Sequence, residues 1–277
     1  MNLGINEIKE ITKAMALYPE MDYSNFLISF LKRRLSLIFD KLKIRKVDLF
    51  IESLSDETVR RTITDYMCVE VTEMFRDPAF WRSIRSNILD KIPDKADTIW
   101  LPHISTGEEL FSLSVILHES EKLSAFKIEC NTPSKTKYSE IITGKINPKH
   151  FDLNQTNYKR LENKELFKDY FNSKNGEVSI KEELRNNIKC NVSNSFTNID
   201  SEANVGLIIF RNIAIYLNHK TTEEIYKELI DKLMPGGFLA IGIKEELPQS
   251  IKDYLIEIDS SEKIYKKPQP KQSNSYA

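Results

Sequence analysis

A short polar segment carries the residues best suited to chemistry: residues 104–109, Ile-Ser-Thr-Gly-Glu-Glu. It follows a predicted strand and opens a predicted helix, so the N–H groups at the helix N-terminus can bind a ligand carboxylate or phosphate. Such sites lie beyond the carboxyl ends of strands in open α/β sheets. The alternative is a simple capping box, with Ser105 or Thr106 as the cap and Glu108 or Glu109 reaching back to it. The spacing alone leaves both interpretations open.

The elements that must position this segment alternate between strands and helices from Pro93 onward. Each short β-rich run is followed by a turn and a helical stretch. This alternation predicts a mainly parallel sheet covered by helices on both faces, which is an α/β fold. The predicted strands cover residues 98–101, 126–130, 205–210 and 238–243, and the predicted helices cover residues 108–121, 134–142 and 221–234.

The first ninety residues predict helices and no strand. Apolar residues recur every three or four positions over residues 23–46, which is the pattern of an amphipathic helix. Asp22 or Ser24 could cap the start of this helix. We therefore expect a helical domain over residues 1–90.

A second domain is expected over residues 91–265. Residues 147–187 are polar and interrupt its strand–helix alternation, which predicts a small antiparallel β-subdomain inserted at that point. Residues 266–277 are rich in Lys, Pro, Gln and Ser and predict a disordered tail.

Composition and charge exclude several classes of protein. The 277 residues are 40% apolar and 29% charged, which rules out collagen-like and low-complexity chains. The net charge of −1 gives no argument for nucleic-acid or membrane binding, and residues 205–217, the most apolar stretch, are too few to span a bilayer. Three distant cysteines predict reduced thiols in a cytoplasmic protein, and four histidines show no metal-ligand spacing. We expect a monomer without metal, nucleic acid or membrane insertion.

Several segments, in order along the chain, resemble the chemotaxis-receptor methyltransferase (CheR) family. Residues 105–109, Ser-Thr-Gly-Glu-Glu, match its signature, and residues 71–78 resemble its Thr-x-x-Phe-Arg-Asp/Glu segment. Residues 210–217 resemble its Cys-Arg-Asn-Val-x-Ile-Tyr-Phe segment, and residues 233–237 resemble its Leu-x-Pro-x-Gly. With a weaker match near the N-terminus, the resemblance covers residues 20–245.

The resemblance implies both a fold and a reaction. The family has a helical N-terminal domain and a Rossmann-like domain with an inserted β-subdomain, and it transfers a methyl group from S-adenosylmethionine to glutamates on chemoreceptor helices. A glutamate is already ionised at pH 7, so the transfer needs alignment and exclusion of water, not a general base. The resemblance implies that Arg76 and Tyr216 hold this carboxylate. Without it, the two are simply a surface arginine and a core tyrosine.

The resemblance also implies residues for the methionine end of S-adenosylmethionine, or of its product S-adenosylhomocysteine. Glu109, and less directly Glu108, would bind the ammonium group, and Thr72 stands where the family contacts the ligand. Arg211 and Asn212 end an apolar strand, where a charge needs a partner. The methionine carboxylate is one such partner, and a structural salt bridge is the alternative.

The adenosine end departs from the family pattern. Asn191 matches the family asparagine near the adenine, and Glu129 stands where the family has a ribose-binding aspartate. Pro102, His103 and Ile104 replace small residues before the Ser-Thr-Gly turn, so His103 either intrudes on the cofactor site or lines it. These departures leave a second function open: a degenerate member that acts as a receptor- or signalling-protein-binding module.

The charges of the chain are unevenly placed. Residues 32–46 carry seven Lys or Arg and one Asp. In the family the helical domain recognises an acidic receptor bundle. The resemblance therefore implies that Lys32, Arg33 and Arg34 form a docking face for the cytoplasmic domain of chemoreceptors, with an ordinary solvated helix face as the alternative.

Overall fold

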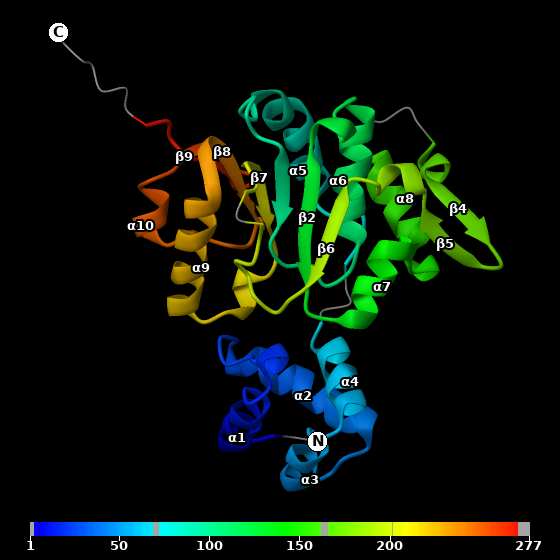
Figure 1. Cartoon of the computed structure of the whole chain (residues 1–277), viewed down its shortest axis with the longest axis vertical. Coiled ribbons are helices and arrows are strands. Elements are labelled where there is room, and N and C mark those ends of the chain that lie inside the picture. Colours follow the sequence, from blue (N-terminus) through cyan, green and yellow to red (C-terminus); the bar gives the residue numbers. More distant parts are fainter. Residues whose placement is uncertain (1–2, 69–71, 162–165, 201, 271–277) are drawn as a thin grey trace.

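Helices without a strand make up residues 3–68, as the apolar spacing predicts. The computed structural model describes residues 3–68, 72–161, 166–200 and 202–270. Helices α1 (Ile5–Met15), α2 (Ile28–Leu42), α3 (Val47–Ser53) and α4 (Glu57–Met67) pack around a core of their own, in the lower part of Figure 1. We refer to this part as the helical unit.

Helix α2 begins later than the apolar periodicity predicts. Its first residue is Ile28 and its N-cap is Leu27, so neither Asp22 nor Ser24 caps it. The residues just before the helix are extended instead, because they pair with the other part of the chain. The helix ends before Lys43, which adopts the left-handed conformation with φ 56°. Tertiary pairing therefore overrides a helical pattern that continues through this segment.

A mostly parallel sheet forms the second part of the chain and confirms the predicted α/β class. Within the described residues, seven strands lie in the order β6-β2-β1-β7-β8-β10-β9. The first five pair in parallel, and β10 and β9 add an antiparallel edge. The bounds are β1 (Thr98–Leu101), β2 (Lys127–Thr132), β6 (Ile188–Val192), β7 (Val205–Phe210), β8 (Leu233–Ile241), β9 (Ile256–Asp259) and β10 (Ile264–Lys266).

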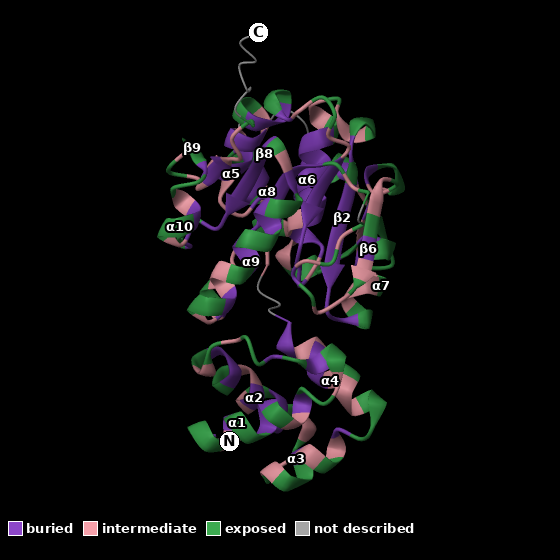
Figure 2. Cartoon of the chain, turned by 60° about the vertical axis from the view of Figure 1, so that its left-hand side comes forward, coloured by how far each residue is buried: buried purple, intermediate pink, exposed green. Residues whose placement is uncertain are grey.

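Helices cover both faces of this sheet. Alternate residues of its strands point to opposite faces, so apolar side chains on each face need helices to bury them. In β1, Ile99 and Leu101 join one core and Trp100 joins the other. Figure 2 shows the strands of the central sheet as buried between the surrounding helices. The core of Ile99 also takes in residues of α5, α6, α7 and α8, and the core of Trp100 takes in α9 and α10. The bounds are α5 (Pro78–Ser83), α6 (Glu108–Glu119), α7 (Lys135–Thr143), α8 (Phe151–Lys159), α9 (His219–Lys232) and α10 (Gln249–Lys252).

The predicted small antiparallel sheet is present between β2 and β6. It consists of β3 (Lys145–Ile146), β5 (Glu177–Ile180) and β4 (Phe171–Lys174), in that spatial order. The turn between β4 and β5 places Asn175 at φ 53° and Gly176 at φ 79°, a left-handed pair that suits a two-residue hairpin. Helix α8 lies within the same insertion.

The packing suggests a division of the chain earlier than residue 90. Trp81, Ile84 and Leu89 pack in the core of the sheet, whereas Met67 belongs to the helical unit. We therefore propose that the two units divide between Met67 and Thr72. None of the described helices is long and apolar enough to cross a membrane.

The first residues of the predicted C-terminal tail, residues 266–270, lie within the described part of the chain and make defined contacts. Strand β10 ends at Lys266, and the Lys267 ammonium donates to the carbonyls of Ile230 and Leu233 at 2.7 Å each. These contacts satisfy backbone acceptors at the end of α9 and fix the chain beyond residue 266. The last part of the predicted tail, residues 271–277, lies outside the described residues.

The helical unit sits against the carboxyl ends of the parallel strands, toward which the arrows of β2 and β6 point in Figure 1. Phe26 forms an antiparallel bridge with Leu217, and Leu27 N donates to Tyr216 O at 2.7 Å. Asn218 N donates to Asn25 O at 2.9 Å. The segment before α2 is thus joined to the loop that follows β7.

Candidate functional site

A cavity of about 510 Å³ lies at the carboxyl ends of β1 and β7. The strand order changes direction between these two strands, which is where open α/β sheets bind ligands. Helix α2 contributes Arg33 and Arg34 to the wall, so the helical unit helps to enclose the cavity. Six residues predicted from the sequence line it, namely Thr72, Arg76, Glu109, Arg211, Asn212 and Tyr216.

The turn after β1 leads directly from the sheet into α6. The N-cap is Gly107, which has no side chain to cap the helix, so the capping box with Ser105 or Thr106 as the cap is wrong. A Cβ atom on Gly107 would overlap the ring of Phe111, so this close turn requires glycine. Glu109 faces the cavity, whereas the buried Glu108 accepts a hydrogen bond from Thr72 Oγ1 at 2.7 Å. The hydrogen bond to Glu108 therefore connects the segment that contains Thr72 to the start of α6.

The segment that presents Arg76 is held in an unusual backbone conformation. The residues on either side of it, Phe75 and Asp77, have left-handed φ angles of 53° and 56°. Neighbouring helices fix this shape: Phe75 N donates to Ser112 Oγ at 2.8 Å, and Trp81 Nε1 donates to Arg76 O at 3.0 Å. Strain of this kind persists where the surroundings over-determine it, which is common at functional sites.

Arg211 is the centre of a buried ion-pair network. Its Nη1 lies 2.8 Å from Glu109 Oε1, and its Nη2 lies 2.6 Å from Asp77 Oδ2. The guanidinium also lies over the Phe80 ring, 3.9 Å from its centre, and the side chain is 1% exposed. The arrangement matches the structural salt bridge that the sequence left open for Arg211. Asp77, which was not predicted as a site residue, completes it, and the match of residues 71–78 to the family segment was the available signal.

Burial raises the pKa of the Glu109 carboxyl, and the charge of Arg211 opposes that shift. Only Oε1 of Glu109 pairs with Arg211, so Oε2 can accept from another cation.

Arg76 and Tyr216 face the cavity together, as the resemblance implies. Across the described part of the chain, no acceptor hydrogen-bonds the half-buried Arg76 guanidinium, in contrast to that of Arg211. The Tyr216 ring lies 4.8 Å from the Phe30 ring and 5.8 Å from the Arg33 guanidinium. Among the described residues, the cavity wall therefore presents a guanidinium without a hydrogen-bond acceptor, together with the side chain of Tyr216, an arrangement suited to an anionic ligand.

His103 lines the cavity and is neutral at pH 7. Burial lowers its pKa to about 4, and its ring packs 5.0 Å from that of Phe196. Its Nδ1 is buried and has no hydrogen-bond partner among the described residues. The structure thus places His103 as a polar lining residue, one of the two roles that the sequence left open.

The free energy of unfolding should depend on pH through His103. The folded pKa is about 4 and the ordinary value is 6.5, so below pH 6.5 the unfolded chain binds a proton that the folded chain does not. Stability from this group is therefore lost as the pH falls from 6.5 toward 4, by about 2 kcal/mol between pH 7 and pH 5. Urea titrations at both pH values should show this loss in the wild type but not in His103→Gln. An equal loss in both proteins would contradict it.

Glu129 and Asn191, predicted for the adenosine end, lie outside the lining of the cavity. Glu129 is buried within β2 opposite Trp100, and its Oε1 lies 3.3 Å from Lys189 Nζ. Strand β2 runs to Thr132, beyond the predicted end at residue 130, because it pairs with β6 from Ile128 to Thr132. The strand end nearest the cavity is therefore occupied by later residues.

Asn131 is the residue that the sequence analysis missed near this strand end. It is fully buried, its O accepts from Ile104 N at 2.8 Å, and Asn191 Nδ2 lies 3.5 Å from its Oδ1. Asn131 thus links the loop after β1 to the end of β6. The polar pair Asn131-Thr132 after an apolar strand was the available signal.

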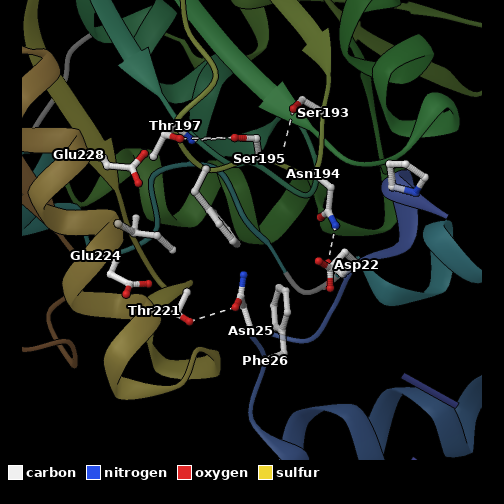
Figure 3. Close-up of a pocket in the computed structure, with 13 residues that line it drawn as sticks. Asp22, Asn25, Phe26, Ser193, Asn194, Ser195, Thr197, Thr221, Glu224 and Glu228 are labelled. Carbon is white, nitrogen blue, oxygen red and sulfur yellow. Dashed lines mark hydrogen bonds between the residues drawn. The ribbon is translucent and has the colours of Figure 1, made fainter. Parts of the chain in front are cut away.

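A second hollow, of about 450 Å³, lies between the helical unit and the sheet (Figure 3). Its polar wall includes Asn25, whose Oδ1 accepts from Thr221 Oγ1 at 3.0 Å, and Asn194, whose Nδ2 donates to Asp22 O at 2.8 Å. None of its lining residues was predicted as a site residue. We interpret this hollow as part of the junction between the two units.

The residues of the larger cavity suit S-adenosylmethionine. Buried polar atoms in its walls, among them His103 Nδ1 and Arg211 Nε, have no hydrogen-bond partner in the described ranges. Glu109 offers a carboxylate oxygen for an ammonium group, and Thr72 and Asn212 supply further polar side chains in the same wall. The lining therefore fits the amino end of the cofactor's methionine and leaves Arg76 available to a second carboxylate.

Comparison with known proteins places the chain in one family. The sequence model of the family described as "CheR methyltransferase, SAM binding domain" matches residues 70–264. Over 246 residues the chain is 24% identical to the Cher3 protein of Pseudomonas putida, covering 87% of this chain and 89% of that protein. It is 22% identical to the chemotaxis protein methyltransferase Cher2 of the same organism and 23% identical to chemotaxis protein methyltransferase 1 of Pseudomonas aeruginosa, each covering 77% of this chain and 80% of the relative. Because the match spans most of the chain, the protein belongs to the CheR family of methyltransferases and uses S-adenosylmethionine as its cofactor.

Proposed function

We propose that this protein methylates glutamate side chains on the cytoplasmic helices of chemoreceptors. The observation that carries the proposal is the guanidinium of Arg76, which faces the cavity beside Tyr216 and lacks a partner among the described residues. A cation so placed can hold a substrate carboxylate. The names of the relatives, which are chemotaxis protein methyltransferases, support a chemoreceptor as the source of that carboxylate.

The chain's own residues supply alignment and a dry environment. When bound, the cofactor supplies an electrophilic methyl group on a sulfonium centre. A glutamate with a pKa of about 4.3 arrives ionised and needs no base. Arg76 would orient it through two N–H groups and Tyr216 would donate one hydrogen bond, which leaves a lone pair free to attack. The transfer consumes both charges, so apolar walls such as Ile104 and Ile213, which exclude water, favour it.

The cofactor residues are proposed in two groups. Glu109, through Oε2, would accept from the methionine ammonium, with Thr72 and Asn212 beside it in the wall of the cavity. Glu129 and Asn191 stay proposals for the adenosine end. Arg211 would act mainly through Asp77 and Glu109, because both terminal nitrogens of its guanidinium are paired.

Two measurements test the proposal in sequence. Calorimetry with S-adenosylhomocysteine should give a binding isotherm, and no heat at millimolar ligand would favour the non-catalytic alternative. Transfer of tritium from labelled S-adenosylmethionine to a chemoreceptor cytoplasmic fragment should then be detected as base-labile methyl ester. Binding of S-adenosylhomocysteine without transfer to any receptor fragment would leave the methyltransferase but reject this substrate.

The proposed docking face needs revision in one respect. Lys32 and Arg33 are exposed on α2, and Arg33 also lies over the Tyr216 ring at the rim of the cavity. Arg34 is half-buried, and its Nη2 donates to the carbonyl oxygens of Tyr66 and Cys68. Arg34 therefore holds the end of α4 in place, and we propose Lys32 and Arg33 alone as the docking pair.

Charge reversal at Lys32 should weaken binding to the receptor fragment. We expect Lys32→Glu to raise the Kd by about 5–10-fold at low salt and by less at high salt, because salt ions screen the attraction between exposed charges. Affinity for S-adenosylhomocysteine should not change, since Lys32 lies outside the cavity wall. Surface plasmon resonance and calorimetry measure the two quantities. Equal loss of both affinities would reject the docking role, and Arg34→Glu should instead lower the thermal midpoint.

A further inference from the structure

The loop that carries Asn212 and Tyr216 rests on a buried carboxylate behind the wall of the cavity. Glu245 follows β8 and is 2% exposed. Its Oε2 accepts from Gly242 N at 2.6 Å and from Asn212 N at 3.0 Å, and its Oε1 accepts from Ile215 N at 3.3 Å. One side chain thus binds three backbone N–H groups, two of which belong to the loop over residues 211–216.

These contacts make the hydrogen bonding of the Glu245 carboxylate depend on the shape of the loop. A buried carboxylate is costly unless its oxygens are satisfied. Among the described residues, no lysine or arginine lies within ion-pair distance of Glu245, so backbone N–H groups supply the compensation. Hydrogen bonds from N–H groups to a carboxylate are stronger than those between neutral groups. If the loop moves, the carboxylate loses two of its donors.

The backbone at Asn212 and Gly242 also allows the loop to pack closely against Glu245. Asn212 has a left-handed φ of 62°, a conformation that asparagine tolerates better than most residues. A Cβ atom at Gly242 would lie 2.7 Å from Glu245 Oε2 and 3.0 Å from Asn212 N. Only glycine therefore allows the strand end, the carboxylate and the loop to approach so closely.

We propose that Glu245 is a positioning residue for the methyltransferase site. It sets the path of residues 211–216, which place Asn212, Ile213 and Tyr216 in the cavity wall and bring Arg211 to Asp77. Glu245 itself is not among the residues that line the cavity. A shift of about 1 Å in such a loop is enough to cost roughly 10²-fold in rate.

The test compares Glu245→Ala with Glu245→Gln, because glutamine keeps one carbonyl oxygen as an acceptor. Hydrogen–deuterium exchange should quicken in peptides that cover residues 207–217, strongly in the alanine variant and weakly in the glutamine variant. The Kd for S-adenosylhomocysteine should rise about tenfold in Glu245→Ala and less than about threefold in Glu245→Gln. The graded rescue by glutamine is the expected signature of positioning.

Glu246→Gln is the matched control, since Glu246 is the neighbouring residue, is 70% exposed and pairs with Lys263 at 2.9 Å. It should match the wild type in both measurements. Unchanged exchange and affinity in a folded Glu245→Ala protein would overturn the proposal. Exchange that quickens equally along the whole chain would also overturn it, because that result indicates a purely structural role. Neither readout depends on the identity of the methyl acceptor, so this test can fail or succeed independently of the proposed substrate.

Discussion

Arg76→Ala is expected to lower kcat/KM for methyl transfer to a chemoreceptor fragment by about 10²–10³-fold. Removing one preorganised group that orients the reacting atoms costs this much in other enzymes. The effect should be large because no hydrogen-bond acceptor among the described residues binds the Arg76 guanidinium, so its N–H groups can all bind the substrate. Arg76→Lys should recover only part of the rate, since an ammonium cannot form the two parallel hydrogen bonds. Tritium transfer at several receptor concentrations measures the effect.

The affinity for S-adenosylhomocysteine separates this role from cofactor binding. It should stay within about threefold of the wild type in Arg76→Ala, because Glu109 and Thr72 are the residues proposed for the methionine end. Arg61→Ala is a suitable control, since Arg61 lies on α4, is 57% exposed and pairs with the surface residue Glu57. A parallel loss of cofactor affinity would move Arg76 into the cofactor site, and full activity would reject it as a substrate residue.

The family resemblance implies that Arg76, Glu109 and Tyr216 belong to one site, and all three line the same cavity. The carboxyl ends of parallel strands meet at one edge of a sheet, which accounts for the approach of Glu109 and Tyr216 because each follows a strand of the sheet. The alternation of short apolar runs with helices likewise predicts the α/β class. These features depend on local patterns that a single chain displays.

The element ends that the sequence did not predict depend on pairing between distant segments. The carboxyl end of β2 is set by its pairing with β6, so the position of Glu129 within the strand follows from the register and not from the pattern of β2. The start of α2 is set by the bridge between Phe26 and Leu217, which lie far apart in sequence.

Buried charges posed the same problem. A sequence can show that Arg211 needs a partner, but it does not show that Asp77 and Glu109 are its two partners. Glu245 was not predicted as a site residue, because its role lies in three backbone contacts. In both cases the partners of the buried charge depend on tertiary structure.

Arg211→Met should be the most destabilising of the single substitutions considered for this site. Removing one partner of a buried ion pair typically costs about 3–5 kcal/mol, because it leaves an uncompensated charge. Here the change leaves two carboxylates, Asp77 and Glu109, without their shared cation, and methionine keeps most of the contact with Phe80. We expect the free energy of unfolding, measured in urea, to fall by at least about 3 kcal/mol. Arg61→Met removes an exposed pair of the same type and should cost less than about 1 kcal/mol.

The pH dependence of Arg211→Met identifies the cause of its instability. Burial already raises the pKa of Glu109 while Arg211 opposes that shift, so loss of Arg211 should raise this pKa further. A carboxyl whose folded pKa lies above its unfolded pKa destabilises the fold as the pH rises through that interval. The deficit relative to the wild type should therefore be smaller at pH 5 than at pH 8. Adding Glu109→Gln to Arg211→Met should recover part of the stability, because one of the two unpaired charges is removed. A deficit that is independent of pH, with no recovery in the double variant, would point to lost packing on Phe80 as the cause.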